Sequence, residues 1–111
     1  MTKDKLLSAV SMARGAGRLK IGFDAAADAV LKGAPIVLLA SDASDRTIRN
    51  ILRLCDENDA KAVELSRTQA EIEKTVGRKF AVAAVCDENF AVLIEKQIGE
   101  ATGGLLNDNK I

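Results

Sequence analysis

The chain has 111 residues, of which 48% are apolar, so it is long enough for one domain with its own hydrophobic core. Its 16 Lys and Arg residues balance 16 Asp and Glu residues, so the net charge of the whole surface does not favour binding to nucleic acid. Any nucleic-acid-binding site must then be a local basic patch. It has no His and only three aromatic residues, so the commonest acid–base side chain is missing and platforms for stacking single-stranded bases are nearly absent.

The first third of the chain predicts a helix, a strand and a second helix. Residues 5–14 place apolar side chains on one helical face, and glycines follow directly. Residues 18–21 alternate polar and apolar side chains, which predicts a short half-buried strand. Residues 23–32 are rich in alanine and predict a helix that Gly33 ends.

A buried strand and a capped helix form the predicted centre of the domain. Residues 36–39 are an uninterrupted apolar run, which is typical of a strand covered on both faces. Asp42 and Ser44 are both good N-caps for the helix that follows, which is expected to run to about Asn58. The turn between this strand and this helix is an exposed place where a ligand site is often found.

The second half repeats the alternation. Residues 62–65 predict a brief strand, and residues 66–69 have the pattern of a capping box that opens a helix. Gly77 ends that helix, and residues 80–86 predict a second buried strand.

Asp87 is expected to cap a last helix that packs through a stripe ending at Ile98. Residues 99–111 are rich in Gly and Asn and predict a flexible tail. Alternating helices and strands indicate a three-layer α/β/α sandwich around a small mixed four-stranded sheet. The predicted domain is therefore residues 1–98.

No pattern of catalysis, metal binding or membrane insertion stands out. The first residues precede no apolar stretch of a signal peptide, no segment is long enough to cross a bilayer, and two cysteines without a secretion signal indicate free thiols in the cytoplasm. Cys55 and Cys86 lack a histidine base and are expected to be small core residues. In residues 14–18 the Gly-x-Gly follows a helix rather than a strand, which does not fit a dinucleotide site. We therefore predict neither an enzyme nor a bound metal or cofactor.

Basic residues recur near the predicted turns and on one helix. Either a phosphate-binding surface or an ordinary solvated surface balanced by nearby acids accounts for this pattern. The cations border the first turn, line one side of the central helix and border the later turn: Arg18, Lys20, Arg46, Arg49, Arg53, Arg78 and Lys79.

Several stretches, in order and spacing, resemble one known family. They are residues 13–22, 29–33, 37–44, 76–79 and 85–91, with Thr47 and Cys55 between them. The chain resembles the kink-turn-binding ribosomal-protein superfamily, of the archaeal large-subunit seven-Ae and thirty-e type. More narrowly, it is similar to the bacterial YlxQ-like branch.

The resemblance implies an α/β/α sandwich that binds kinked RNA helices without catalysis. It also implies a cytoplasmic protein whose partner is structured RNA or the ribosome, with no cofactor and no small-molecule substrate. Such proteins use the turn and first residues of the second helix together with the loop before the last strand. Both bends should then lie at one edge and present a cationic rim. The implied RNA-binding residues are Arg18, Lys20, Gly22, Phe23, Asp24, Arg46, Gly77, Arg78 and Lys79.

The first of these two sites departs from the family pattern, which reads Gly-x-Asn/Glu-Glu-x-x-Lys. Gly22 matches, and Asp24 is able to accept hydrogen bonds as an amide or a glutamate would. Ala25 replaces the glutamate, and Asp28 replaces the lysine with an anion, which should weaken binding to phosphates. The alternative is therefore a divergent protein-interaction module that keeps the fold and has lost kink-turn binding.

Overall fold

The computed structural model describes the backbone of residues 4–101 and the side chains of residues 4–98. Helices and strands alternate through this range, as the sequence predicts. Their bounds are α1 Lys5–Gly15, β1 Leu19–Ile21, α2 Phe23–Leu31, β2 Ile36–Leu39, α3 Asp45–Glu57, β3 Lys61–Glu64, α4 Gln69–Val76, β4 Val82–Val85 and α5 Glu88–Ala101.

The strands form one mixed four-stranded sheet in the order β1-β4-β2-β3. β4 is antiparallel to both of its neighbours, β1 and β2, whereas β2 and β3 run parallel. The two central strands, β2 and β4, are buried at every position, as expected for strands covered on both faces.

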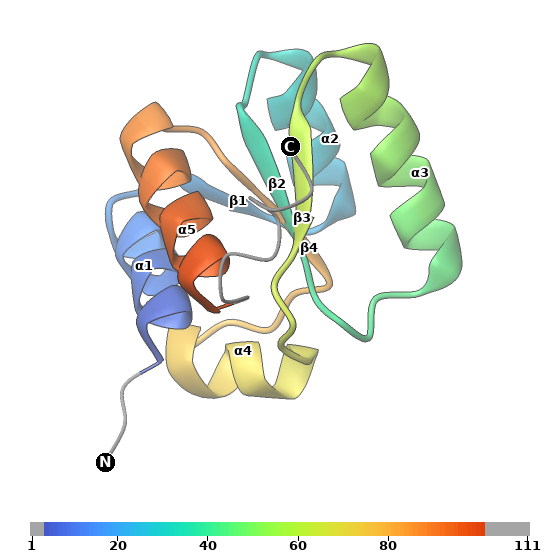
Figure 1. The fold of residues 1–111 in the computed structure, drawn as a ribbon. Coiled ribbons are helices and arrows are strands. Elements are labelled where there is room, and N and C mark those ends of the chain that lie inside the picture. Colours follow the sequence, from blue (N-terminus) through green and yellow to red (C-terminus); the bar gives the residue numbers. More distant parts are fainter. Residues whose placement is uncertain (1–3, 102–111) are drawn as a thin grey trace.

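Helices cover both faces of this sheet, which confirms the predicted three-layer α/β/α sandwich (Figure 1). One core lies between the sheet and α1, α4 and α5, and it contains Leu38, Ile72 and Ile94. The other core lies between the sheet and α2 and α3, and it contains Val37 and Ile51. Leu38 and Val37 belong to different cores because successive side chains of a strand point to opposite faces.

The helix caps differ from two of the predictions. The capping box of α4 is formed by Thr68 and Glu71 rather than by residues 66–69. Ser66 is unsuited to this role because its backbone is left-handed, with φ 58°, and an N-cap requires an extended conformation. Ser44 caps α3, while the other candidate, Asp42, accepts a hydrogen bond from the first backbone N–H of α4.

The last predicted strand is shorter than residues 80–86. Only Val82–Val85 pair in the sheet, and Phe80 instead inserts into the first core from the preceding loop. Cys86 follows the strand and is exposed, so the expectation of a core residue was wrong there, whereas Cys55 is buried as predicted. The residue type alone did not show that the side chain directly after Val85 is exposed to solvent.

Two other boundaries shift. β3 begins one residue earlier than predicted, at Lys61, and pairs in parallel with β2 through Glu64. α5 continues to Ala101, so the first three residues of the predicted tail are helical. The rest of that tail, 102–111, lies outside the described residues.

An ion pair that the sequence does not predict joins the start of α1 to the loop before α4. Asp4 caps α1 by accepting from the backbone N–H of Leu7 at 3.1 Å. The same carboxylate accepts from Nε of Arg67 at 2.7 Å and from Nη2 at 3.3 Å. This hydrogen bond to Arg67 lowers the pKa of Asp4, and the same bond raises the pKa of Arg67.

We expect Asp4→Asn to reduce the free energy of unfolding by about 1 kcal/mol at pH 7, because asparagine caps a helix equally well and only the charge-assisted pair is lost. The contribution of a carboxyl with a lowered pKa is present above its ordinary pKa of about 4 and disappears as the pH falls through the lowered value. Urea unfolding from pH 7 down to pH 2 should therefore show the two proteins converging in acid. Asp28→Asn, which breaks only an exposed pair with Lys32, is the control and should change stability by less than about 0.5 kcal/mol.

Candidate nucleic-acid interface

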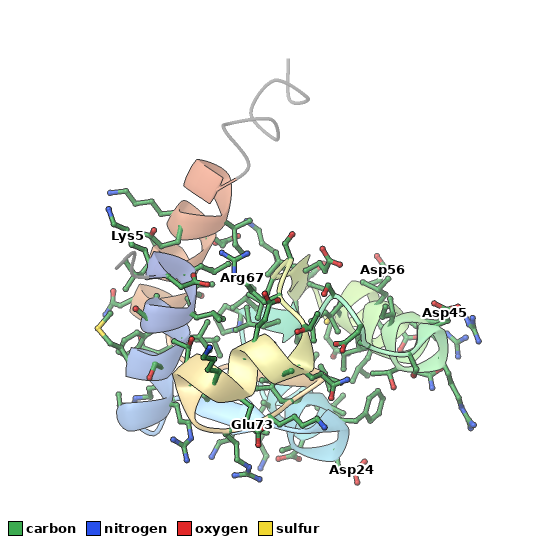
Figure 2. All side chains as sticks on the ribbon, turned by 90° about the horizontal axis from the view of Figure 1, so that it is seen from below. Lys5, Asp24, Asp45, Asp56, Arg67 and Glu73 are labelled. Carbon is green, nitrogen blue, oxygen red and sulfur yellow. The ribbon has the colours of Figure 1, made fainter. Side chains whose placement is uncertain are left out.

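One edge of the sheet gathers several of the predicted site residues. β1, β2 and β3 all end there, and the antiparallel β4 begins there, so four connections meet at this side of the molecule. We call this side the loop edge; it consists of the turn at Gly22 and of residues 40–44, 65–68 and 77–81. Figure 2 looks onto this side, with Glu73 of α4 and Asp24 of α2 labelled.

Backbone hydrogen bonds join the two bends that the sequence singles out. Gly22 donates its N–H to the carbonyl of Val82 at 2.9 Å, directly after the loop that carries Arg78 and Lys79. Ala40, at the end of β2, likewise donates to Ala81 at 2.9 Å. The start of α2 and the loop before β4 are thus neighbours at the loop edge.

The first bend leaves the beginning of α2 without a side-chain cap. Gly22 is the N-cap, with φ 100° and ψ 159°, a conformation that only glycine adopts readily. The first helical hydrogen bond is made by the N–H of Ala26 to the carbonyl of Gly22, at 2.9 Å. The N–H groups of residues 23–25 have no carbonyl within the helix, and they lie at the positive end of its dipole, where acceptors and anions bind well.

The two side chains of this bend have different surroundings. Phe23 is half-buried and packs against the core beneath α2 and α3. Asp24 is exposed in the first turn of the helix and projects outward at the lower edge of Figure 2. Phe23 therefore anchors the turn, while Asp24 is free to accept hydrogen bonds from a ligand.

The second bend presents cations from an anchored loop. Gly77 ends α4 in the left-handed conformation, with φ 87°, and donates its N–H to the carbonyl of Glu73. Arg78 and Lys79 follow and are exposed, and Phe80 is only 3% exposed. Because Phe80 is fixed in the core, the two cations are held outward.

Arg14 adds a cation that the sequence prediction did not include. It lies near the end of α1, and its Nη1 donates to the carbonyl of Val76 at 3.3 Å. A Cβ added to Gly77 would meet the same Nη1 at 3.4 Å, so the guanidinium lies against the second bend. The two partners are 62 positions apart, and only the packing of α1 beside α4 brings them together.

Two further arginines border the loop edge, and only one is available to a ligand. Arg46 is exposed in the first turn of α3, just after the Ser44 cap. Arg67 is held by Asp4. Within residues 4–98, no ion pair involves Arg46, Arg78 or Lys79.

Arg18 and Lys20 are placed apart from these residues. The carbonyl of Arg18 accepts from the N–H of Cys86 at 2.9 Å, and its Nε lies 3.8 Å from the carboxylate of Asp87. This is the opposite end of β1 from Gly22. Lys20 lies midway along β1 and lines an open hollow of about 330 Å³ together with Lys32.

The loop edge carries charges of both signs. Asp24, Asp45 and Glu73 are exposed on the adjoining helices α2, α3 and α4, on the same side of the molecule as the cations. Asp28 pairs with Lys32 at 3.0 Å one turn further along α2. The cationic character of the edge is therefore concentrated at the second bend rather than spread along the whole rim.

The remaining chemistry of the molecule is limited. In the part of the chain that the structure describes, no three potential ligands among Cys, Asp and Glu are grouped to hold a metal ion. Both cysteines are free, and burial raises the pKa of the Cys55 thiol, which disfavours the reactive thiolate. None of the described helices is long and apolar enough to cross a membrane.

Comparisons with known proteins find likenesses among the solved structures. No model of a known protein family matches the chain, and no curated protein sequence matches it. A protein of unknown function from Bacillus halodurans is 27% identical with a TM-score of 0.75, covering 84% of this chain and 99% of its own. A 15.5-kD RNA-binding protein from Giardia lamblia is 16% identical with a TM-score of 0.71, covering 95% of this chain and 93% of its own.

Proposed function

We propose that this protein binds structured RNA without catalysis, and that it docks a kinked RNA helix of the kink-turn type on the loop edge. Its proposed partner, in the cytoplasm, is the ribosome or another structured RNA. The observation that carries the proposal is the hydrogen bond from Gly22 to Val82, because it joins the start of α2 to the first residue of β4, directly after the loop that carries Arg78 and Lys79. The family resemblance assigns RNA binding to these same two bends. The shared fold with an RNA-binding protein from Giardia lamblia is consistent with this role.

Each bend supplies a different kind of contact. The unsatisfied N–H groups at the start of α2 suit acceptors on RNA, and Asp24 suits donors on base edges. Arg78 and Lys79 suit the phosphates of the other strand of the RNA helix. Arg46 adds a cation at the border of the loop edge. We leave Arg18 out of the proposed site because it lies at the other end of β1, beside Asp87.

The proposal is tested by measuring fluorescence anisotropy of the whole chain with a labelled kink-turn RNA and a straight duplex of equal length, at several salt concentrations. We expect tighter binding to the kinked RNA, and affinity for both RNAs that falls as salt rises, because phosphate contacts release counterions. Equal binding to both RNAs, at micromolar strength or weaker, would contradict a kink-turn role.

A protein-interaction module is the second candidate, favoured by the anionic residue on α2. Asp28 occupies the lysine position of the family pattern, and its nearby cation, Lys32, is already paired with it. Purification from lysate with and without nuclease separates the two candidates. A partner that stays bound after nuclease treatment would support the protein-interaction role.

We expect Asp28→Lys to tighten binding to kink-turn RNA several-fold at low salt, because it removes an anion, adds a cation and releases Lys32 from its ion pair. Asp56→Lys makes the same charge change at an exposed helical position on α3, and it controls for net charge. Binding that appears only in the Asp28 variant would mean that the natural protein has lost the kink-turn role.

A further inference from the structure

We propose that Arg14 of α1 is part of the RNA-binding site, where it contacts a backbone phosphate beside Arg78 and Lys79. This inference rests on the proposed function and extends the site to a third element of the fold. α1 and α4 cover the same face of the sheet, and this packing places Arg14 against the end of α4. Three cations from two separate segments therefore meet at the second bend.

The guanidinium of Arg14 is held in place without being neutralised. One of its five N–H donors goes to the carbonyl of Val76 at 3.3 Å, and no carboxylate in the described chain lies within ion-pair distance of it. The carbonyl end of a helix carries partial negative charge, which favours a cation at this place. The remaining N–H donors of this planar guanidinium suit the oxygens of a phosphate.

Gly77 lies directly beside this guanidinium. A Cβ at residue 77 would stand 3.4 Å from Nη1 of Arg14, an ordinary van der Waals distance, so the guanidinium lies over the bend, while the left-handed backbone at φ 87° is what favours glycine there. Arg78 is the next residue and is exposed. The two cations reach one short loop from different elements, which suits two consecutive phosphates of one RNA strand. A single acidic side chain would need only one of the two cations.

The test compares Arg14→Gln with Arg18→Gln, two exposed arginines four positions apart, of which Arg14 lies against the second bend and Arg18 lies beside Asp87. The kink-turn RNA and the whole chain are used at several salt concentrations. For Arg14→Gln we expect about 5- to 10-fold weaker binding at low salt and a salt slope reduced by about one, the value for a single phosphate that is no longer neutralised. Arg18→Gln should leave both quantities nearly unchanged.

Arg14→Lys separates a phosphate contact from a structural role, because lysine keeps the charge but loses the fork. We expect its salt slope to stay close to that of the natural protein. A weaker affinity of Arg14→Gln with an unchanged slope would mean that Arg14 acts only by holding the loop, and would overturn the inference. Binding that is lost in Arg78→Gln but unchanged in Arg14→Gln would overturn the inference while sparing the proposed function, whereas no binding by the natural protein would overturn both.

Discussion

Replacing Arg78 and Lys79 together by glutamate is expected to weaken binding of kink-turn RNA by about 100-fold or more at low salt, because two phosphate contacts become two repulsions. The slope of affinity against salt should fall by about two, one for each phosphate that is no longer neutralised. Folding should be unaffected, since both side chains are exposed and form no ion pair among the described residues. Thermal unfolding of the double variant checks this.

The matched control places the same charge change elsewhere. Arg49 and Arg53 are also exposed, on α3, and Arg49→Glu with Arg53→Glu takes the net charge to the same value. We expect this control to weaken binding by no more than about 3-fold, through the long-range field alone. Equal losses in the two double variants would show that net charge, rather than the second bend, governs binding.

Gly22→Ala is expected to reduce RNA affinity about 10-fold or more, because the backbone at the start of α2 must reorganise and no longer presents its N–H groups to the ligand. With φ 100° and ψ 159°, Gly22 lies in a region that costs a residue with a side chain roughly 1–3 kcal/mol. Alanine therefore either destabilises the fold by that amount or shifts the turn. Anisotropy with the kink-turn RNA measures the loss of affinity, and urea unfolding measures the loss of stability.

Gly33→Ala controls for the loss of stability. Gly33 has φ 99°, and a Cβ there meets nothing within 4 Å, as is also true of Gly22, but it lies at the far end of α2. Both variants should lose stability, and only Gly22→Ala should lose RNA affinity beyond that. A parallel loss of affinity in both variants would mean that the turn at Gly22 has no direct part in binding.

Local rules explain how much of the fold was predictable. The apolar runs of β2 and β4, the glycine at the end of α4 and the caps Ser44 and Asp87 all depend on residues within one turn or strand, and the structure contains each of them. The errors have the same origin. The capping box was misplaced by two residues because the pattern at Ser66 is compatible with a cap, and only the backbone conformation of the folded loop excludes it.

For the candidate site, likewise, the residue types were predictable from the sequence and their arrangement in space was not. The residue types at the two bends follow from the sequence, as does the order of elements that places each bend next to a strand end. Whether those bends are neighbours depends on the antiparallel pairing of β4 with β1, which brings Gly22 to Val82 across about sixty positions of chain. No local sequence pattern contains that information, because the pairing of the strands depends on burying the apolar side chains of both cores at once.

The sequence by itself determined the layered architecture and the candidate cations, because apolar periodicity and caps act over a few residues. The tertiary structure alone decided which cations share a surface. It separated Arg18 from the loop edge, engaged Arg67 with Asp4, and brought Arg14 to the second bend. The physical reason is that helix packing and strand order, rather than distance along the chain, set which charges lie within contact of one another.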